Sequence, residues 1–176
     1  MRVFIAIPVA NQLNSKIEVF HAQPLFQQNM RPSHVEPHIT LKAPQIVDDV
    51  QQWMATATEA IRGHAPLSIK GIKIDFITPH TLALFLEPDP LQDLQRSLAT
   101  ALAAYNSAGI DRHEVNFHPH VTIGRSDHRF NTPQQGELIR LAESFLEPYP
   151  TLQLNLVRLY AHDGHRYYGI KDIKLP

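Results

Sequence analysis

Two short stretches of this sequence share one pattern, Pro-His-Ile-Thr-Leu at residues 37–41 and Pro-His-Val-Thr-Ile at residues 119–123. By chance, a chain of this composition contains about 0.045 copies of Pro-His-x-Thr, so two copies indicate a real repeat. In a β-strand, residues i and i+2 point to the same face. The pattern therefore predicts that the histidine and threonine of each stretch share one face of a strand, while the aliphatic residues beside them face a core.

The elements predicted around the two stretches follow the same order in both halves of the chain. A strand is predicted at 2–8, and the order helix–strand–helix–strand–strand then occurs twice. The predicted helices are at 11–23, 48–63, 89–105 and 132–147, and the predicted strands are at 38–43, 67–77, 81–87, 119–124, 151–161 and 166–174. Residues 24–37 are predicted to be a polar loop, and residues 106–109 to break the third helix.

This internal repeat predicts an α+β protein with one bilobal domain over residues 1–176. The two repeat units span approximately 11–87 and 90–174, and residues 2–8 form an extra strand. We expect two pseudo-symmetric antiparallel β-sheets with helices on the outer faces and a central cleft, which is a usual place for a ligand.

Three local signals refine this prediction. Residues 132–135, Thr-Pro-Gln-Gln, are typical of a capping box with proline at the first helical position. The apolar alternation shifts after Gly71, which indicates a β-bulge. Residues 163–164, Asp-Gly, indicate a hairpin turn between the last two strands.

Composition excludes several classes of protein. The chain has 176 residues, of which 16 are Lys or Arg and 17 are Asp or Glu, and its net charge of −1 argues against coating nucleic acid with bulk positive charge. It has no cysteine, which excludes disulfide scaffolds, thiolate metal sites and cysteine nucleophiles. No stretch approaches the roughly 18 apolar residues of a membrane span. We expect a cytoplasmic protein with no membrane partner.

The paired residues suit one kind of reaction. An unperturbed pKa of about 6.5 lets one of His38 and His120 remove a proton near neutral pH while the other donates one. The hydroxyls of Thr40 and Thr122 can donate hydrogen bonds to phosphate oxygens. We therefore predict that these four residues are catalytic in a displacement at a phosphodiester that needs no metal and no cofactor.

The two strands also carry a resemblance to a known family. The segments Arg2-Val3-Phe4-Ile5-Ala6-Ile7, Pro37-His38-Ile39-Thr40-Leu41-Lys42 and Phe117-His118-Pro119-His120-Val121-Thr122-Ile123-Gly124-Arg125 resemble the two-histidine (2H) phosphoesterase superfamily. Within it, the chain is most similar to the LigT-like RNA 2′,3′-cyclic phosphodiesterases, historically called 2′-5′ RNA ligases. The resemblance implies a bilobal fold with both motifs on a central groove. It also implies an enzyme of RNA processing that opens a 2′,3′-cyclic phosphate at the end of RNA or of a nucleotide.

Three further residues are predicted to bind the substrate. The resemblance implies that Arg125 clamps a phosphate. Strict alternation would place Arg125 on the other face of the strand from His120, unless Gly124 breaks the alternation. Lys42 shares a face with the first motif by alternation, and Phe4 is a candidate for stacking on a base. His118 is read as a structural residue, because no third metal ligand lies nearby at a recognisable spacing.

The resemblance also suggests how the proton transfers are divided. It implies that His38 is the acid nearest the leaving O3′, and the product is then a 2′-phosphate. We expect the protein to be a monomer. The sequence leaves two other hypotheses open. One is the same chemistry on a different small cyclic phosphodiester, and the other is a non-catalytic module that binds RNA ends or nucleotides. Ligation of 2′-5′ bonds is conceivable as the reverse of the same path.

Overall fold

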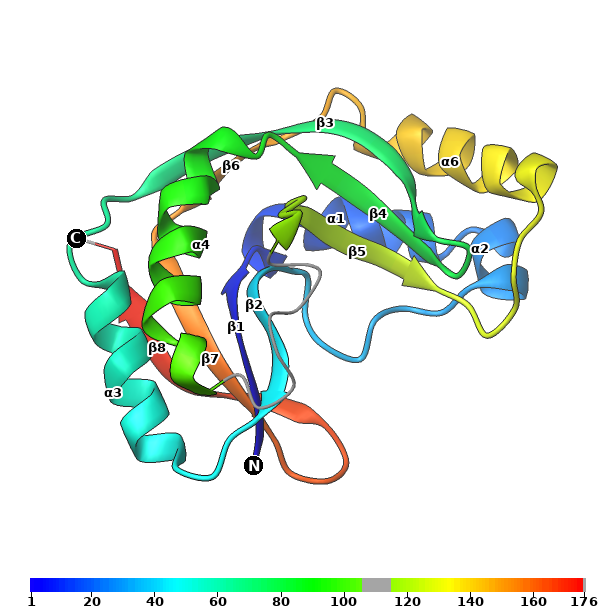
Figure 1. Cartoon of the computed structure of the whole chain (residues 1–176). Coiled ribbons are helices and arrows are strands. Elements are labelled where there is room, and N and C mark those ends of the chain that lie inside the picture. The colour runs from blue at the N-terminus through cyan, green and yellow to red at the C-terminus, as the bar shows by residue number, and fades with distance from the viewer. Residues whose placement is uncertain (106–114, 176) are drawn as a thin grey trace.

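In the part of the chain that the structure describes, eight antiparallel strands form the centre of the molecule. The computed structural model describes residues 1–105 and 115–175, and places the strands in one sheet in the order β6-β3-β4-β5-β2-β1-β7-β8 (Figure 1). The strands are β1 (Arg2–Pro8), β2 (His38–Ile46), β3 (Leu67–Thr78), β4 (Thr81–Leu86), β5 (His120–Arg125), β6 (Thr151–Leu154), β7 (Leu156–His162) and β8 (Tyr167–Lys174). The predicted α+β class is confirmed.

The single sheet corrects one detail of the prediction. Two separate sheets were expected, one for each repeat unit, but the hairpins are exchanged between the halves of the chain. The hairpin β3–β4 of the first half pairs with β5 of the second half, and β7 of the second half pairs with β1. The physical reason is that β2 and β5 pair with each other at the centre, which joins both halves into one hydrogen-bonded ladder.

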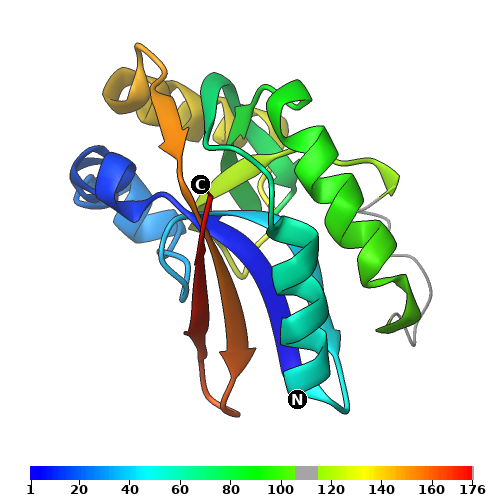
Figure 2. The ribbon, with the colours of Figure 1, turned by 90° about the vertical axis from the view of Figure 1, so that its left-hand side faces the viewer.

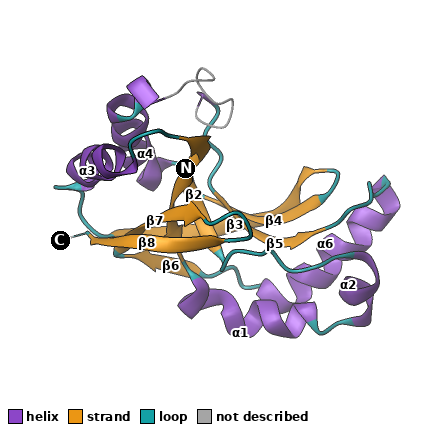
Figure 3. Ribbon diagram, turned by 90° about the horizontal axis from the view of Figure 1, so that it is seen from below, coloured by secondary structure: helices purple, strands orange, loops and turns teal. Residues whose placement is uncertain are grey.

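The helices form two groups that lie apart from each other (Figures 2 and 3). One group contains α3 (Val50–Ile61) and α4 (Asp89–Ala101), which pack on each other, and α4 also contacts β2 and β3. The other group contains α1 (Ala10–His21), α2 (Pro24–Asn29) and α6 (Thr132–Leu146), where α1 contacts both α2 and α6. A 3-10 turn, η1 (Ala103–Tyr105), follows α4, and the helix break expected at 106–109 lies outside the described residues.

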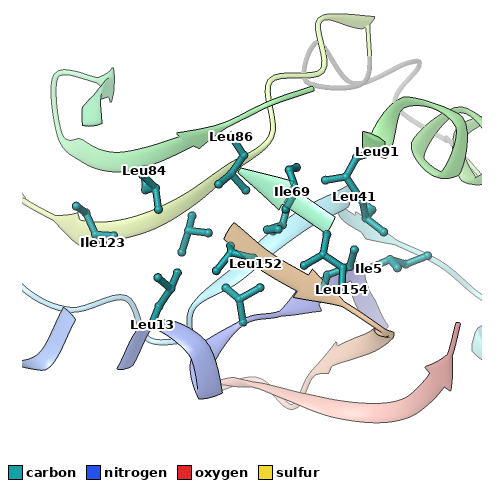
Figure 4. Packing of buried hydrophobic residues seen from close by; sticks show 14 of the residues in the cluster. Ile5, Leu13, Leu41, Ile69, Leu84, Leu86, Leu91, Ile123, Leu152 and Leu154 are labelled. Carbon is teal, nitrogen blue, oxygen red and sulfur yellow. The ribbon is translucent and has the colours of Figure 1, made fainter. Parts of the chain in front are cut away.

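A continuous apolar core lies between the sheet and these helices. Alternate residues of the central strands enter it, as the period of two predicts. Figure 4 shows Ile5 of β1, Leu41 of β2, Leu84 of β4 and Ile123 of β5 in this cluster with helix residues such as Leu13. The opposite face of these strands is therefore available for polar residues.

Two local predictions are wrong in position. The segment predicted as a loop at 24–37 begins with the short helix α2, because a proline is accommodated in a first helical turn and Phe26 is buried in the core. The capping box starts at Asn131 and not at Thr132, since the Asn131 side chain accepts from the backbone N–H of Gln134 and the Gln134 side chain accepts from that of Asn131, both at 3.0 Å. The bulge after Gly71 is confirmed by a register shift in the β3–β4 pair.

The described helices were also compared with the length and apolar character that a membrane crossing requires. None of those within residues 1–105 and 115–175 meets both requirements.

The tight packing of α2 on β5 generates a stability prediction. A Cβ atom added at Gly124 would lie 2.9 Å from the Phe26 ring and 3.1 Å from the Met30 side chain, both of which are buried. Gly124→Ala should therefore force the core to shift and lower the free energy of unfolding by about 1–3 kcal/mol. Urea denaturation measures this change.

Gly136→Ala is the matched control. Gly136 lies in α6, and its nearest neighbour would be the flexible end of Arg140 at 3.4 Å. Alanine is a better helix former, so this variant should gain up to about 1 kcal/mol. Equal stability of the two variants would contradict the packing argument.

Candidate active site

The two repeated motifs meet at the centre of the sheet. Strands β2 and β5 pair antiparallel with Ile39 opposite Val121, the middle residues of the two motifs. Both side chains are fully buried in the core. The antiparallel register then sets His38 across from Thr122 and His120 across from Thr40, on the face turned away from the core. The sequence prediction that the two motifs converge agrees with this placement.

A cavity of about 540 Å³ opens on this face. Thr40, His120 and Thr122 line it together with Arg125. The remaining lining residues are Leu41, Ala43, Pro44, Ile77, Thr78, Thr81, Phe85, Asn116, Phe117 and His118. His38 is half-buried and is not among the lining residues. It lies next to the cavity, because the strand pairing sets it across from the lining residue Thr122. The cavity therefore has a polar end at the motifs and an apolar, partly aromatic wall.

Both histidine rings are held in the same way. Nδ1 of His38 lies 2.7 Å from the main-chain oxygen of Glu36, and Nδ1 of His120 lies 2.9 Å from that of His118. A carbonyl oxygen only accepts, so each Nδ1 donates its proton. In the neutral ring the lone pair is then on Nε2, which makes Nε2 the atom that can take up or release a proton in each motif.

The His38 ring lies beside two aromatic side chains. Its ring centroid lies 5.4 Å from that of Phe4 and 6.2 Å from that of Tyr160. Burial is the main effect and lowers the pKa of His38, and the positive charges of His120 and Arg125 act in the same direction. The Glu36 main-chain oxygen and carboxylate oppose this change. The neutral ring therefore predominates at neutral pH in the free protein.

The prediction that Phe4 stacks on a base is wrong in this structure. Phe4 is only 2% exposed, because Tyr160 stacks on its face at 4.4 Å and Tyr167 meets it edge-on at 4.8 Å. These contacts cover the ring and keep a base from stacking on it. Phe4 instead packs beside His38, and Tyr167 on the final hairpin, with His162 against it at 4.7 Å, extends this aromatic group.

Arg125 lies on the same face as the second motif. In the β4–β5 pair, Arg125 is opposite Thr81 and Thr122 is opposite Ala83, with a register shift between them. Thr81 and Ala83 are two apart on one strand and so share a face. The bulge at Ile123 and Gly124 thus reverses the parity, in the way that the glycine allows, and brings the Arg125 side chain to the cavity.

The placement of Lys42 contradicts the prediction. A register shift in the β1–β2 pair sets Lys42 opposite Ile5, whereas Thr40 is opposite Ala6. Ile5 belongs to the main core, so the bulge turns Lys42 away from the face of the first motif. Lys42 is 2% exposed and does not line the cavity, and it is therefore not placed to contact a phosphate there.

The structure adds lining residues that sequence reasoning missed. Thr81 and Phe85 face the cavity because β4 pairs directly with β5, with Phe85 opposite His120 at a ring distance of 6.0 Å. Phe117 and His118 come from the segment just before β5. Only Phe117 and His118 could have been anticipated from the sequence, because they directly precede the second motif. Nothing in the sequence indicates that β4 is the neighbour of β5.

No candidate metal centre was found in the part of the chain that the structure describes. Within residues 1–105 and 115–175, no group of three His, Cys, Asp or Glu residues is arranged to hold a metal ion. His118 is exposed at the cavity, and its main-chain oxygen holds the His120 ring.

Two histidine–threonine strands paired at the centre of a sheet and opening on one cavity define the class of two-histidine phosphoesterases. A family model described as the 2′-5′ RNA ligase superfamily matches residues 13–166. The chain belongs to this superfamily, and the resemblance seen in the sequence is confirmed. Membership indicates a phosphoesterase.

Solved structures with the same fold share little sequence. TT0787 of Thermus thermophilus is 16% identical with a TM-score of 0.67, and the match covers 99% of this chain and 98% of that one. E. coli LigT complexed with NADP+ is 19% identical with a TM-score of 0.66, over 99% and 96%. E. coli LigT complexed with 3′-AMP is 19% identical with a TM-score of 0.67, over 99% and 97%. No curated protein sequence matches the chain.

The burial of His38 predicts its titration. Because burial lowers its pKa, the His38 ring in the free protein should titrate below the value of 6.5 of an unperturbed histidine. NMR of the histidine ring protons, assigned with a His38→Gln variant, measures the midpoint. The same residue in a short unfolded peptide is the reference. A midpoint at or above that of the peptide would contradict the structure.

Proposed function

We propose that this protein is a metal-independent phosphodiesterase that hydrolyses 2′,3′-cyclic phosphate ends of RNA or of nucleotides to a 2′-phosphate. The observation that carries the proposal is the antiparallel pairing of Ile39 with Val121, which sets two imidazoles and two threonine hydroxyls on one face beside a cavity. An acid and a base on the two sides of a bound phosphodiester supply both proton transfers that hydrolysis requires.

The reaction balances with these groups alone. Water attacks phosphorus and forms a new P–O bond while one imidazole takes its proton at Nε2. The P–O3′ bond breaks, and the second imidazole gives its proton to O3′. The product is a 2′-phosphate with a free 3′-hydroxyl, and proton exchange with water restores both rings.

The other polar groups of the cavity suit the phosphate. Thr40 and Thr122 can donate hydrogen bonds to its non-bridging oxygens, and Arg125 adds a guanidinium with several N–H donors on the same face. Lys42 and Phe4 are not part of this proposal. The apolar wall at Phe85 and Phe117 leaves room for a nucleoside.

The similar structures support a nucleotide as the class of ligand. E. coli LigT has been crystallised with 3′-AMP and with ATP. The first of these carries a phosphate on the ribose 3′ position, next to the position at which the proposed reaction leaves it. For this chain, a ribose phosphate is therefore the first ligand to test.

Turnover of 2′,3′-cyclic AMP and of an RNA oligomer with a 2′,3′-cyclic phosphate end tests the function. In EDTA, the wild type should convert at least one of them to the product with a 2′-phosphate and a free 3′-hydroxyl. His38→Ala and His120→Ala should each lower kcat by about 10²–10⁴-fold with the fold intact. His64→Ala, at a half-buried ring bonded to Ser97 at 3.1 Å outside the cavity, is the control and should remain active.

Other outcomes of this experiment overturn the proposal in defined ways. Loss of wild-type activity in EDTA would contradict the metal-independent mechanism. Turnover of a different cyclic phosphodiester alone would replace the substrate. Binding of 3′-AMP without turnover of any cyclic substrate would favour a non-catalytic nucleotide-binding module.

A leaving-group experiment assigns the acid. The proposal keeps His38 as the acid, which acts from the protonated form of its ring, the minor form in the free protein at neutral pH. The His38→Ala variant should regain at least about tenfold of its lost activity on an aryl phosphodiester, whose leaving group departs without a proton. The His120→Ala variant should not regain it, because water still lacks a base. Recovery of His120→Ala alone would reverse the two roles.

A further inference from the structure

The two motifs are not equivalent in what surrounds them. Two residues before each histidine, the chain supplies the carbonyl that holds the ring, and this residue is Glu36 in the first motif and His118 in the second. The His118 side chain is exposed at the cavity. The Glu36 side chain instead turns to β7, where it is partly buried and held at two points.

A fixed network surrounds the Glu36 carboxylate. Its Oε1 atom accepts from Nη1 of Arg158 and from the hydroxyl of Tyr160, both at 2.8 Å. Arg158 also donates from Nε and Nη2 to the two oxygens of Asp172, at 2.6 and 2.7 Å. Two carboxylates therefore share one guanidinium, which leaves the group with a net negative charge. Burial and the neighbouring carboxylate raise the pKa of Tyr160, so that its hydroxyl stays a donor.

This network reaches His38 by two routes. The main chain of Glu36 accepts the Nδ1–H of His38, so fixing the carboxylate also fixes the carbonyl that orients the ring. The Tyr160 ring stacks on Phe4, which packs beside the His38 ring. The position, the tautomer and the electrostatic surroundings of His38 thus depend on the same few residues.

We propose that Glu36, held by Arg158 and Tyr160, is a positioning residue that orients His38 and supports its protonated form. The proposal rests on the proposed function, in which His38 transfers a proton. Whether His38 acts as acid or as base, it carries a proton at one stage of the cycle, and its apolar surroundings oppose that charge. The excess negative charge of the Glu36 group offsets part of this penalty.

The other charged and titratable groups on the strands near His38 either oppose its protonated form or are engaged with one another. His120 and Arg125 face it from β5 and disfavour a second positive charge. From β7 come Arg158 and Tyr160, and from β8 come Tyr167, which contacts Phe4, and Asp172, which is engaged with Arg158. The negative charge of Glu36, together with the hydrogen bond from the ring to its main chain, favours the imidazolium.

The test is the titration of His38 by NMR in Glu36→Gln. This variant removes the charge but keeps the size and the backbone carbonyl, so the midpoint of His38 should fall by roughly 0.5 to 1 pH unit. The limb of the pH–rate profile that belongs to His38 should move to lower pH by the same amount. At neutral pH, kcat should fall more than KM rises, because the change affects proton transfer.

Two further variants separate charge from structure. Glu59→Gln breaks an exposed Glu–Arg pair with Arg62 on α3 and should leave the His38 midpoint unchanged. Tyr160→Phe removes one hydrogen bond to Glu36 and keeps the carboxylate and the ring stack, so it should move the midpoint less than Glu36→Gln. Thermal melting of each variant checks that it is folded.

An unchanged or raised His38 midpoint in folded Glu36→Gln would overturn the proposal, as would an equal shift in Glu59→Gln. The NMR titration needs no substrate, so its result is distinguishable from failure of the proposed function. Absence of wild-type turnover would overturn the function, whereas an unshifted titration with an active wild type would overturn only the role of Glu36.

Discussion

The pairing of β2 with β5 is the contact on which the rest of the structure depends. Ile39 and Val121 join these strands in register, and both are buried in the core. Because successive side chains of a strand point to opposite faces, burying these two aliphatic residues on one face places their neighbours on the other face. The core thus determines where the imidazoles and hydroxyls meet, and a one-residue slip of either strand would turn its histidine and its threonine away from the cavity.

Residue patterns in the sequence predicted the parts of the structure that obey local rules. The alternation in the two motifs placed His38, Thr40, His120 and Thr122 on one face, and the apolar stripes predicted the long helices. The alternation of residues in the sequence could not predict the register shifts. A bulge moved Lys42 toward the core, and another brought Arg125 to the cavity. Only the second had a visible cause, the glycine at position 124.

Neighbours across the sheet were the other part that no local pattern could supply. Phe4 has the alternation expected of an exposed face, yet Tyr160 and Tyr167 from the far end of the chain cover it. Phe85 reaches the cavity because β4 lies beside β5. Likewise Glu36, Arg158 and Asp172 look like ordinary surface charges in the sequence, and their association depends on β7 lying between β1 and β8 in the sheet. Such pairings are a property of the whole topology.

The exchange of hairpins between the two halves has a consequence for synthesis on the ribosome. The first half of the chain carries β3 and β4, but the strand that pairs with β4 on its cavity side is β5, in the second half. Likewise one edge of β1 is covered by β7, which is synthesised more than 140 residues later. The nascent first half therefore has open strand edges until β5 and β7 have been synthesised, and the two histidines come together only through contacts distant in sequence, which form slowly.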